Sequence, residues 1–389
     1  MRRFIGFFLI ILFLSCNNDK KIKTHNQLIN DSLLTKTEAK KLKDELYKKY
    51  SAELVVNRLQ EMKERRIKIK DREMKFDLRF FGEKPISGWK LYFHLHGGGE
   101  APDSINEKEW IKNQTLHTVK NGIILIPRSP TNTWDMWHQA HIDSFLNRLI
   151  QNMIAFHDVN PNRIYLMGRS AGGDGVYQLS PRMADRFAAT AMMAGHPNET
   201  SPLGLRNIGF TIHMGAKDSA YDRNKVAIEW RDKLQALREN DPEGYEHWVE
   251  IYKDKGHWVD RLDSSAIGWI TQFIRNPFPE KVVWKQDDVT HNRFYWLRVN
   301  DPVKSSFIVA NIRDQTIYIE KSNLSEIIIM LNDDIIDMDK KIIVKYLENE
   351  LFNSIVPRNV NTIEKSIKEY GDPQSVYSGE ILIALNNSK

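Results

Sequence analysis

The pentapeptide Gly168-Arg-Ser-Ala-Gly172 holds the residue best placed to do chemistry, a serine at position 170 between two glycines. It follows the mostly apolar run 163–167 and leads into a segment that we expect to be helical from Gly173. A sharp strand-to-helix turn exposes the serine hydroxyl, and its crowded flanks favour residues without side chains. The pattern therefore predicts that Ser170 is a nucleophile that forms an acyl-enzyme.

A run of glycines lies upstream, where the apolar segment Trp89–Leu95 is expected to be a buried strand that ends in His96–Gly99. Backbone N–H groups in such a turn can point toward the serine. We expect Gly98, Gly99 and Ala171 to donate to the oxyanion that forms during acyl transfer. Losing one such donor typically costs about 3–4 kcal/mol of transition-state stabilisation.

A carboxylate and a histidine follow two later strands of the pattern. Asp218 comes after the apolar segment 209–214, and His257 lies in a glycine-flanked loop after the segment 247–252. In the chain order Ser170, Asp218, His257, the acid orients the imidazole and the imidazole moves the serine proton. These three residues are the predicted catalytic triad.

Other residues of the same types are alternatives. Asp222 lies four residues beyond Asp218 and could serve as the acid instead. His196 follows the predicted strand 188–193 and could border the pocket, while His213 lies within an apolar strand, where a core histidine is the commoner outcome. His257 is favoured because it alone follows the last predicted strand of this region in a glycine-flanked loop.

Alternating strands and helices are required to position these residues. Period-two patterning at 67–69 and 74–80 predicts edge strands, and apolar runs further along predict the strands of a parallel sheet. The expected parallel strands are 91–95, 122–126, 164–167, 188–193, 210–214 and 249–252, with helices starting near Trp110, His141, Gly173, Asn224 and Ser264.

These motifs together resemble the α/β-hydrolases of the carboxylesterase and polyhydroxybutyrate-depolymerase-like group, which includes feruloyl and acetyl-xylan esterases. The matching stretches are Leu95–Gly99, Gly168–Gly175, Gly215–Asp218 and Gly256-His257, and the resemblance covers about residues 75 to 276. It implies an α/β-hydrolase fold and a serine esterase that needs no metal or other cofactor. Prolyl-oligopeptidase-type peptidases have a similar elbow, but too little chain precedes residue 75 for their β-propeller.

The overall composition fits a globular protein and points away from nucleic acid. The chain has 389 residues, 41% hydrophobic and 28% charged, with a formal net charge of +5. Much of the positive excess lies between Lys36 and Lys75, where it fits a solvated helical face better than a nucleic-acid site. No metal-ligand or nucleic-acid motif occurs, so we expect no metal, no cofactor and no nucleic-acid partner.

The N-terminus resembles a bacterial lipoprotein signal. Arg2-Arg3 precedes the apolar run 4–14, which is too short to span a bilayer, and Cys16 is the only cysteine of the chain. Phe13 replaces the usual leucine of the lipobox. We expect cleavage before Cys16, lipidation there, including palmitate, and a position in the bacterial cell envelope; ordinary secretion and a cysteine without a role are alternatives.

The predicted domains follow from these segments. Residues 1–16 form the signal and lipidated cysteine, 17–66 a tether and helical segment, 67–276 the catalytic domain, and 277–389 a small β-rich accessory domain that starts at a proline-rich boundary. A carbohydrate-binding role for the accessory domain would require an exposed aromatic platform. Tyr295 and Trp296 are adjacent, so in a strand at most one of them can face solvent.

The loops after the strands should set the substrate. We expect a pocket formed by Arg128, Trp134, His138, Arg169 and Trp258. The aromatic residues could provide an acyl or sugar platform, and the two arginines with His138 could give the mouth a positive field. The substrate would then be a small or oligosaccharide ester, and the positive field would suit an acidic one. A peptidase and a non-catalytic binding lipoprotein are the alternative functions.

Overall fold

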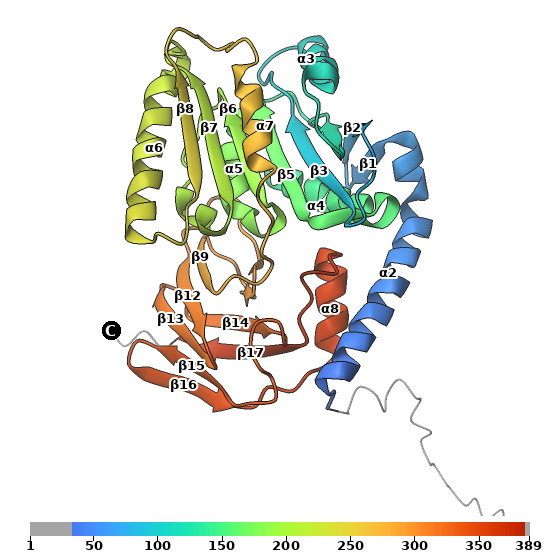
Figure 1. Cartoon of the computed structure of the whole chain (residues 1–389), viewed down its shortest axis with the longest axis vertical. Coiled ribbons are helices and arrows are strands. Elements are labelled where there is room, and N and C mark those ends of the chain that lie inside the picture. The colour runs from blue at the N-terminus through green and yellow to red at the C-terminus, as the bar shows by residue number, and fades with distance from the viewer. Residues whose placement is uncertain (1–32, 386–389) are drawn as a thin grey trace, which may run out of the picture.

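The computed structural model describes residues 33–385, and its largest element is an eight-stranded sheet in the order β1-β2-β4-β3-β5-β6-β7-β8 (Figure 1). Strand β2 pairs antiparallel with β1 and β4, and all strands from β4 to β8 pair in parallel. With its flanking helices this is the α/β-hydrolase fold, which confirms the prediction. The strands are β1 (Arg66–Ile69), β2 (Arg72–Phe81), β3 (Trp89–Leu95), β4 (Gly122–Pro127), β5 (Val159–Arg169), β6 (Ala189–Met193), β7 (Gly209–Gly215) and β8 (His247–Tyr252).

Helices cover both faces of this sheet because alternate side chains of its strands point in opposite directions. Leu91 and Phe93 of β3 belong to the core cluster beneath α4, α5 and α6, whereas Tyr92 belongs to the cluster on the side of α3 and α7. The helices are α3 (Asp103–Leu116), α4 (Ala140–His157), α5 (Ala171–Arg182), α6 (Arg223–Asn240) and α7 (Ser265–Ile270). Helix α3 begins well before the predicted Trp110, since its polar first turns carry no apolar periodicity.

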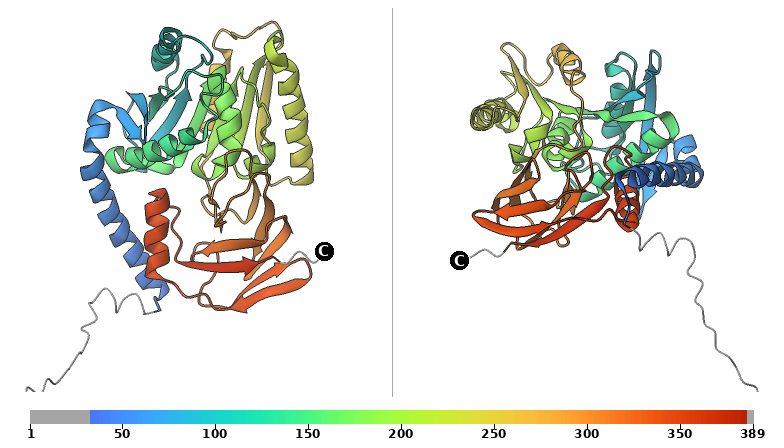
Figure 2. Two further views of the ribbon diagram at one scale, coloured as in Figure 1. Left: turned by 180° about the vertical axis from the view of Figure 1, so that it is seen from behind. Right: turned by 60° about the horizontal axis from the view of Figure 1, so that its bottom comes forward.

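A long N-terminal helix, α2 (Lys36–Glu64), joins the two ends of the molecule. Thr35 caps it in a reciprocal capping box with Glu38. The helix packs on α4 and on α8 (Val360–Tyr370), as Figure 1 and the view from behind in Figure 2 both show. No helix of residues 33–385 is long and apolar enough to cross a membrane.

The C-terminal region forms two smaller sheets with the orders β10-β11-β14-β17 and β16-β15-β13-β12-β9. Between β10 and β11 the chain turns at Tyr295, which has a positive φ of 52°. Tyr295 and Trp296 are both buried, so neither forms an exposed platform. The strands are β9 (Lys281–Lys285), β10 (Arg293–Phe294), β11 (Leu297–Arg298), β12 (Phe307–Arg313), β13 (Thr316–Ser322), β14 (Glu326–Leu331), β15 (Ile342–Tyr346), β16 (Asn349–Ser354) and β17 (Gly379–Ala384).

A buried ionic cluster joins this region to the large sheet domain. Asp372, just after α8, pairs with Arg275 at 2.6 Å and with Arg186 at 3.7 Å. Arg275 also donates to the side chain of Asn162 and to the backbone oxygen of Asp185. The hydrophobic core is continuous across the same boundary. The β-rich region is therefore held firmly against the large sheet.

Candidate active site

Ser170 lies at the turn between β5 and α5, in a backbone conformation that few residues other than glycine adopt. Its φ is 58° and its ψ is −125°. The turn is held by hydrogen bonds from Ser170 N–H to the Met193 oxygen and from Asp174 N–H to the Ser170 oxygen. A Cβ at Gly172 would lie 2.3 Å from the Leu95 oxygen, so the close approach of β3 requires a glycine. The local geometry is that of a strained nucleophile elbow.

The three predicted triad residues form one hydrogen-bonded chain. His257 Nε2 lies 2.9 Å from Ser170 Oγ, and His257 Nδ1 lies 2.7 Å from Asp218 Oδ2. They meet because β5, β7 and β8 run parallel and end at the same edge of the sheet. The Asp218 side chain is 2% exposed, whereas that of His257 is 41% exposed. The acid is thus shielded, and the imidazole remains accessible to a substrate.

The alternative residues are engaged elsewhere. Asp222 is exposed and pairs with Lys225 at 2.7 Å. His213 is buried between Thr211 and the Tyr252 hydroxyl, and burial lowers its pKa to about 4, as expected for a core histidine. His196 accepts from the Asn198 N–H rather than contacting Ser170. The structure brings none of the three into the hydrogen-bonded chain.

The oxyanion loop requires one correction. Gly99 N–H donates to Asn106 Oδ1 at 2.9 Å, so the expectation that this amide is free to bind an oxyanion is wrong. Asn106 also donates back to the Gly99 oxygen, and a Cβ at Gly98, where φ is +119°, would lie 2.1 Å from Asn106 Oδ1. The N–H groups of Gly98 and Ala171 make no hydrogen bond within residues 33–385.

Buried polar groups fix this loop from below. His96 Nδ1 lies 2.6 Å from the Gly97 oxygen, and His96 Nε2 accepts from the Ser129 N–H at 3.1 Å. Trp137 Nε1 donates to the His96 oxygen at 2.9 Å. Burial lowers the pKa of His96 to about 3, so the ring is neutral and serves as a fixed link between two loops.

Arg169 contacts the loop of the histidine rather than the solvent. Its Nη2 donates to the His257 backbone oxygen at 2.5 Å, and its guanidinium lies 4.1 Å from the centre of the Trp258 ring. Lys112 of α3 also lies over that ring, at 5.0 Å. Since Arg169 directly precedes Ser170, it couples the nucleophile turn to the loop that carries the base.

The predicted positive mouth is not supported by the other two residues. Arg128 is buried and is held by Asp103 and Glu107, at 2.9 and 3.4 Å. His138 is buried too, and this burial lowers its pKa to about 4, which leaves the ring uncharged near neutral pH. The prediction was wrong for both because the carboxylates of α3 and the depth of the loop are not visible in the local sequence.

Two tryptophans remain exposed near the nucleophile. Trp134 is 55% exposed and Trp258 is 39% exposed. A Cβ at Gly99 would lie 3.6 Å from the Trp134 Cα and 3.7 Å from the Ala171 Cβ, which places Trp134 beside the oxyanion loop. The rim, the surface around Ser170, is therefore aromatic both beside the oxyanion loop and beside the loop that carries His257.

Asp174 is a buried carboxylate beside the triad to which the sequence analysis gave no role. It is 9% exposed, and its Oδ1 accepts from the His196 N–H at 2.6 Å. Burial raises its pKa to about 6, against the opposing effects of the His196 hydrogen bond and of Arg223 and His257. Its position in the elbow motif was visible, but its burial was not.

Two further expectations from the sequence concern lipid attachment at Cys16 and the absence of a metal site. Cys16 lies outside the described residues. Among residues 33–385, no group of three or more histidine, cysteine, aspartate or glutamate side chains is arranged to hold a metal ion.

Comparisons with known proteins add little beyond this geometry. The sequence matches no protein-family model, and no curated protein matches it. Among solved structures, the chain is similar to a thermostable esterase at 19% identity and a TM-score of 0.40, covering 54% of this chain and 62% of that one. It is also similar to a ferulic acid esterase (15%, 0.39, covering 53% and 95%) and to an acetyl xylan esterase from Aspergillus awamori (14%, 0.35, covering 51% and 93%). We draw no functional argument from likenesses this distant.

Proposed function

We propose that the protein is a serine hydrolase that cleaves carboxylic esters through an acyl-serine intermediate. The observation that carries the proposal is the hydrogen-bonded chain from Ser170 through His257 to Asp218, with distances of 2.9 and 2.7 Å. A serine hydroxyl is a weak nucleophile until an adjacent base accepts its proton. Here the base is within hydrogen-bond reach and is itself oriented by a shielded carboxylate.

The acylation step follows from these positions. His257 Nε2 takes the proton from Ser170 Oγ as the oxygen attacks the ester carbon, and Asp218 stabilises the imidazolium that forms. The carbonyl oxygen becomes negative and is stabilised by the N–H groups of Gly98 and Ala171. The imidazolium then protonates the departing alcohol, and the C–O bond to that alcohol breaks.

Deacylation reverses the roles with water in place of the alcohol. His257 removes a proton from the water as it attacks the acyl-serine, and the same two N–H groups stabilise the second oxyanion. The proton returns to Ser170 Oγ as the acid product leaves. No step requires a metal ion or an organic cofactor.

The substrate that the rim favours is a neutral ester with a flat or short acyl part. Trp134 and Trp258 offer aromatic faces, while Arg128 and His138 supply no free positive charge. Short-chain or aryl esters, including those on polysaccharide fragments, fit such a surface. The runner-up function is a peptidase of the prolyl-oligopeptidase type; a non-catalytic binding role is disfavoured by the connected triad.

The test is hydrolysis of p-nitrophenyl acetate, butyrate and octanoate by the purified chain and its Ser170→Ala variant. We expect activity that falls with acyl length and a loss in kcat on the order of 10⁶-fold in the variant, as for removal of a nucleophilic serine elsewhere. Ser104→Ala, an exposed change in α3, is the matched control. Retained activity in Ser170→Ala would exclude this serine as the nucleophile.

A panel of dipeptide amides separates the esterase from the peptidase. Faster turnover of esters than of matched amides supports the proposal, and preferred amide cleavage favours the alternative. No turnover of either class by the wild-type chain would leave the binding role.

We also propose that the protein is a lipoprotein of the bacterial cell envelope, attached to the membrane through lipid on Cys16. The arginine-led apolar run before this single cysteine supports the proposal. Incorporation of labelled palmitate should occur in the wild-type chain and disappear in Cys16→Ser. Equal labelling of the two chains would contradict it.

A further inference from the structure

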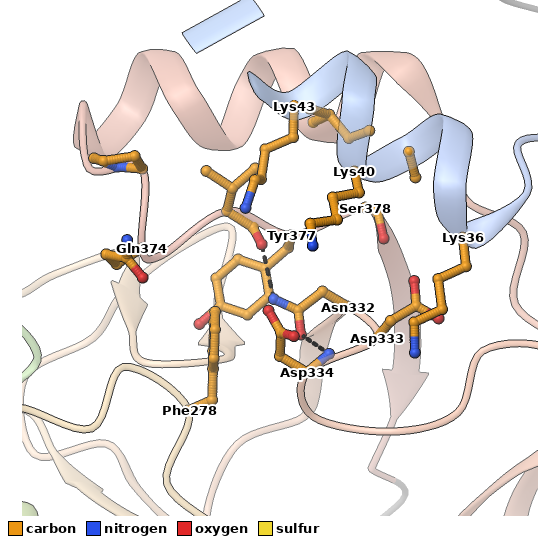
Figure 3. Close-up of a pocket in the computed structure, with 14 residues that line it drawn as sticks. Lys36, Lys40, Lys43, Phe278, Asn332, Asp333, Asp334, Gln374, Tyr377 and Ser378 are labelled. Carbon is orange, nitrogen blue, oxygen red and sulfur yellow. Dashed lines mark hydrogen bonds between the residues drawn. The ribbon is translucent and has the colours of Figure 1, made fainter. Parts of the chain in front are cut away.

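A cavity of about 170 Å³ lies at the opposite end of the molecule from the triad. It is enclosed by the first turns of α2, by the loop Asn332–Asp334 after β14, and by the segment Pro373–Ser378 between α8 and β17 (Figure 3). In Figure 1 these elements are at the bottom, whereas the loops that follow β7 and β8 are at the top. The cavity is therefore separate from the proposed esterase site.

Three lysines of α2 line one wall of this cavity: Lys36, Lys40 and Lys43. Their spacing of four and three residues places them on one face of the helix. Figure 3 shows the side chains of Lys40 and Lys43 extending from α2 toward the opposite wall. Lys43 lies 3.8 Å from the neighbouring Asp44, and Lys36 and Lys40 form no ion pair among the residues that the structure describes.

The carboxylates of the cavity do not neutralise these ammonium groups. Asp333 is already held by Arg358 through two hydrogen bonds of 2.5 and 2.8 Å. Asp334 is exposed and has no cationic partner within 4 Å among residues 33–385. Among the residues that line the cavity, three ammonium groups thus face one unpaired carboxylate. Outside the lining, Asp44 beside Lys43 and Asp337 near Lys36 offset part of this positive charge.

The opposite wall combines two packed aromatic rings with polar side chains that are already bonded. Phe278 packs edge-on against the buried ring of Tyr377, with centroids 5.6 Å apart. Asn332 donates to the Val376 oxygen at 2.8 Å and accepts from the Asp334 N–H at 3.0 Å, so its amide is already used. A ligand here would meet ammonium groups on one side and a rigid, partly aromatic surface on the other.

We propose that this cavity binds a phosphate ester, with its phosphate held by Lys36, Lys40 and Lys43. Lysine ammonium groups act as point charges and suit the oxygens of a phosphate, whereas a planar carboxylate is matched best by the fork of arginine. The volume of about 170 Å³ is several times the roughly 30 Å³ share of one water molecule, which leaves room for a few carbons beyond the phosphate. The ester is either a soluble phosphate or the headgroup of an anionic lipid.

The experiment measures binding of glycerol 3-phosphate to the purified chain by calorimetry at low salt. The test variant carries Lys40→Gln and Lys43→Gln together, and the control is Lys41→Gln on the same helix. The Lys41 side chain is 78% exposed and pairs with Glu45 at 3.8 Å, outside the cavity. We expect at least about a tenfold weaker affinity in the double variant, about 1.4 kcal/mol, and a change below about twofold in the control.

A second arm identifies the source of the phosphate. Sedimentation is measured with vesicles of phosphatidylglycerol in phosphatidylcholine, beside vesicles of phosphatidylcholine alone. Sedimentation of the chain with the vesicles that requires the anionic lipid and is lost in the double variant identifies a lipid headgroup as the ligand. Binding of glycerol 3-phosphate by calorimetry, without sedimentation on anionic vesicles that depends on the lysines, identifies a soluble phosphate as the ligand. Either result supports the proposal.

Two results would overturn the proposal. One is that the wild-type chain binds neither glycerol 3-phosphate at millimolar concentration nor the anionic vesicles. The other is that Lys41→Gln weakens binding as much as the double variant, which would mean only a diffuse charge effect. Thermal unfolding of both variants verifies that they fold, and their hydrolysis of p-nitrophenyl acetate should equal that of the wild type because the triad is remote.

Discussion

Two buried aspartates lie in very different electrostatic surroundings, one in the candidate active site and one at the junction between the two regions of the molecule. Asp174 lies beside the nucleophile with no cation within ion-pair distance among the described residues, and its burial raises its pKa to about 6. Asp372 lies at the junction with the β-rich region, where burial alone would also raise the pKa. There Arg275 and Arg186 outweigh burial, and the pKa of Asp372 is lowered.

This difference distinguishes the junction, where charges hold the structure rigid, from the elbow, where polar groups stay accessible. At the junction, the carboxylate is 1% exposed and both arginines are anchored by further hydrogen bonds, so the charges serve to fix two layers together. At the elbow, the imidazole of His257 is accessible to a substrate, and the carboxylate of Asp174, which has no cation partner, is free to change its protonation state. Groups with that freedom are typical of sites where chemistry occurs.

The largest effect is expected at the junction. Asp372→Ala should lower the free energy of unfolding by about 3–5 kcal/mol, because it leaves two buried guanidinium groups without their partner. Urea denaturation measures this loss. Glu45→Gln, which breaks the exposed pair with Lys41, is the matched control and should change stability by less than about 0.5 kcal/mol.

Ester hydrolysis by the remaining folded Asp372→Ala protein should stay close to that of the wild type. Should the alanine variant fail to accumulate, Asp372→Asn preserves the shape and tests the charge alone. A stability loss no larger than that of Glu45→Gln would erase the distinction between the two regions.

The next effect is expected at the elbow, in Arg169→Gln. The change removes the hydrogen bond to the His257 oxygen and the contact with Trp258. A hydrogen bond from a charged group contributes about 1.5–3 kcal/mol to stability, so the variant should also unfold more easily. Because the lost bond holds the loop of the base, kcat should fall by about tenfold or more, with KM nearly unchanged. Steady-state kinetics measure the split.

The same variant separates positioning from substrate charge. A positioning role lowers kcat equally for neutral and anionic esters, and it changes the shape of the pH–rate profile because His257 is held less firmly. Arg169→Lys, which keeps the charge but loses the planar contact, should recover only part of the rate. A rise in KM confined to anionic esters would instead support the positive mouth.

The smallest effect concerns the pH dependence of stability in Asp174→Asn. The native pKa of Asp174 is about 6 and its usual value is 3.8, so the folded state binds more protons between these values. This residue therefore makes the wild type less stable as the pH rises through that window. The asparagine variant should lose that contribution and be relatively more stable near pH 7 than near pH 4.

Urea denaturation of both chains across the pH range measures this difference. Because buried histidines such as His213 bind protons less well in the folded state, both chains also lose stability toward low pH. The comparison therefore uses the difference between the two chains at each pH. A difference that stays constant from pH 4 to pH 7 would show that Asp174 is not the titrating group.

The sequence was sufficient to predict those features that depend on residues close together in the chain. The elbow at Ser170 follows from the crowding of its turn, which the flanking glycines indicate. The parallel strands could be recognised as apolar runs between helices, and their common edge brings Asp218 and His257 to the serine.

What the sequence left unpredicted depends on contacts between distant segments. Asn106, which accepts the hydrogen bond of the Gly99 amide, lies in α3. The predicted start of this helix was too late because its first turns are polar. Arg128 was read as a free charge, but residues 21 to 25 positions earlier neutralise it. The pairing of Asp372 with Arg186 spans nearly half of the chain, and no local pattern reports it.

Helix α2 places the first described residues of the chain at the end of the molecule that lies away from the nucleophile turn. At 1.5 Å per residue, the 29 residues of this helix extend about 43 Å, from beside the β-rich region to the edge of the large sheet. The helix acts as a spacer fixed along its length by α4 and α8. The turn that carries Ser170 therefore lies about the length of this helix away from the first described residues, so the two ends of the molecule can contact different surroundings.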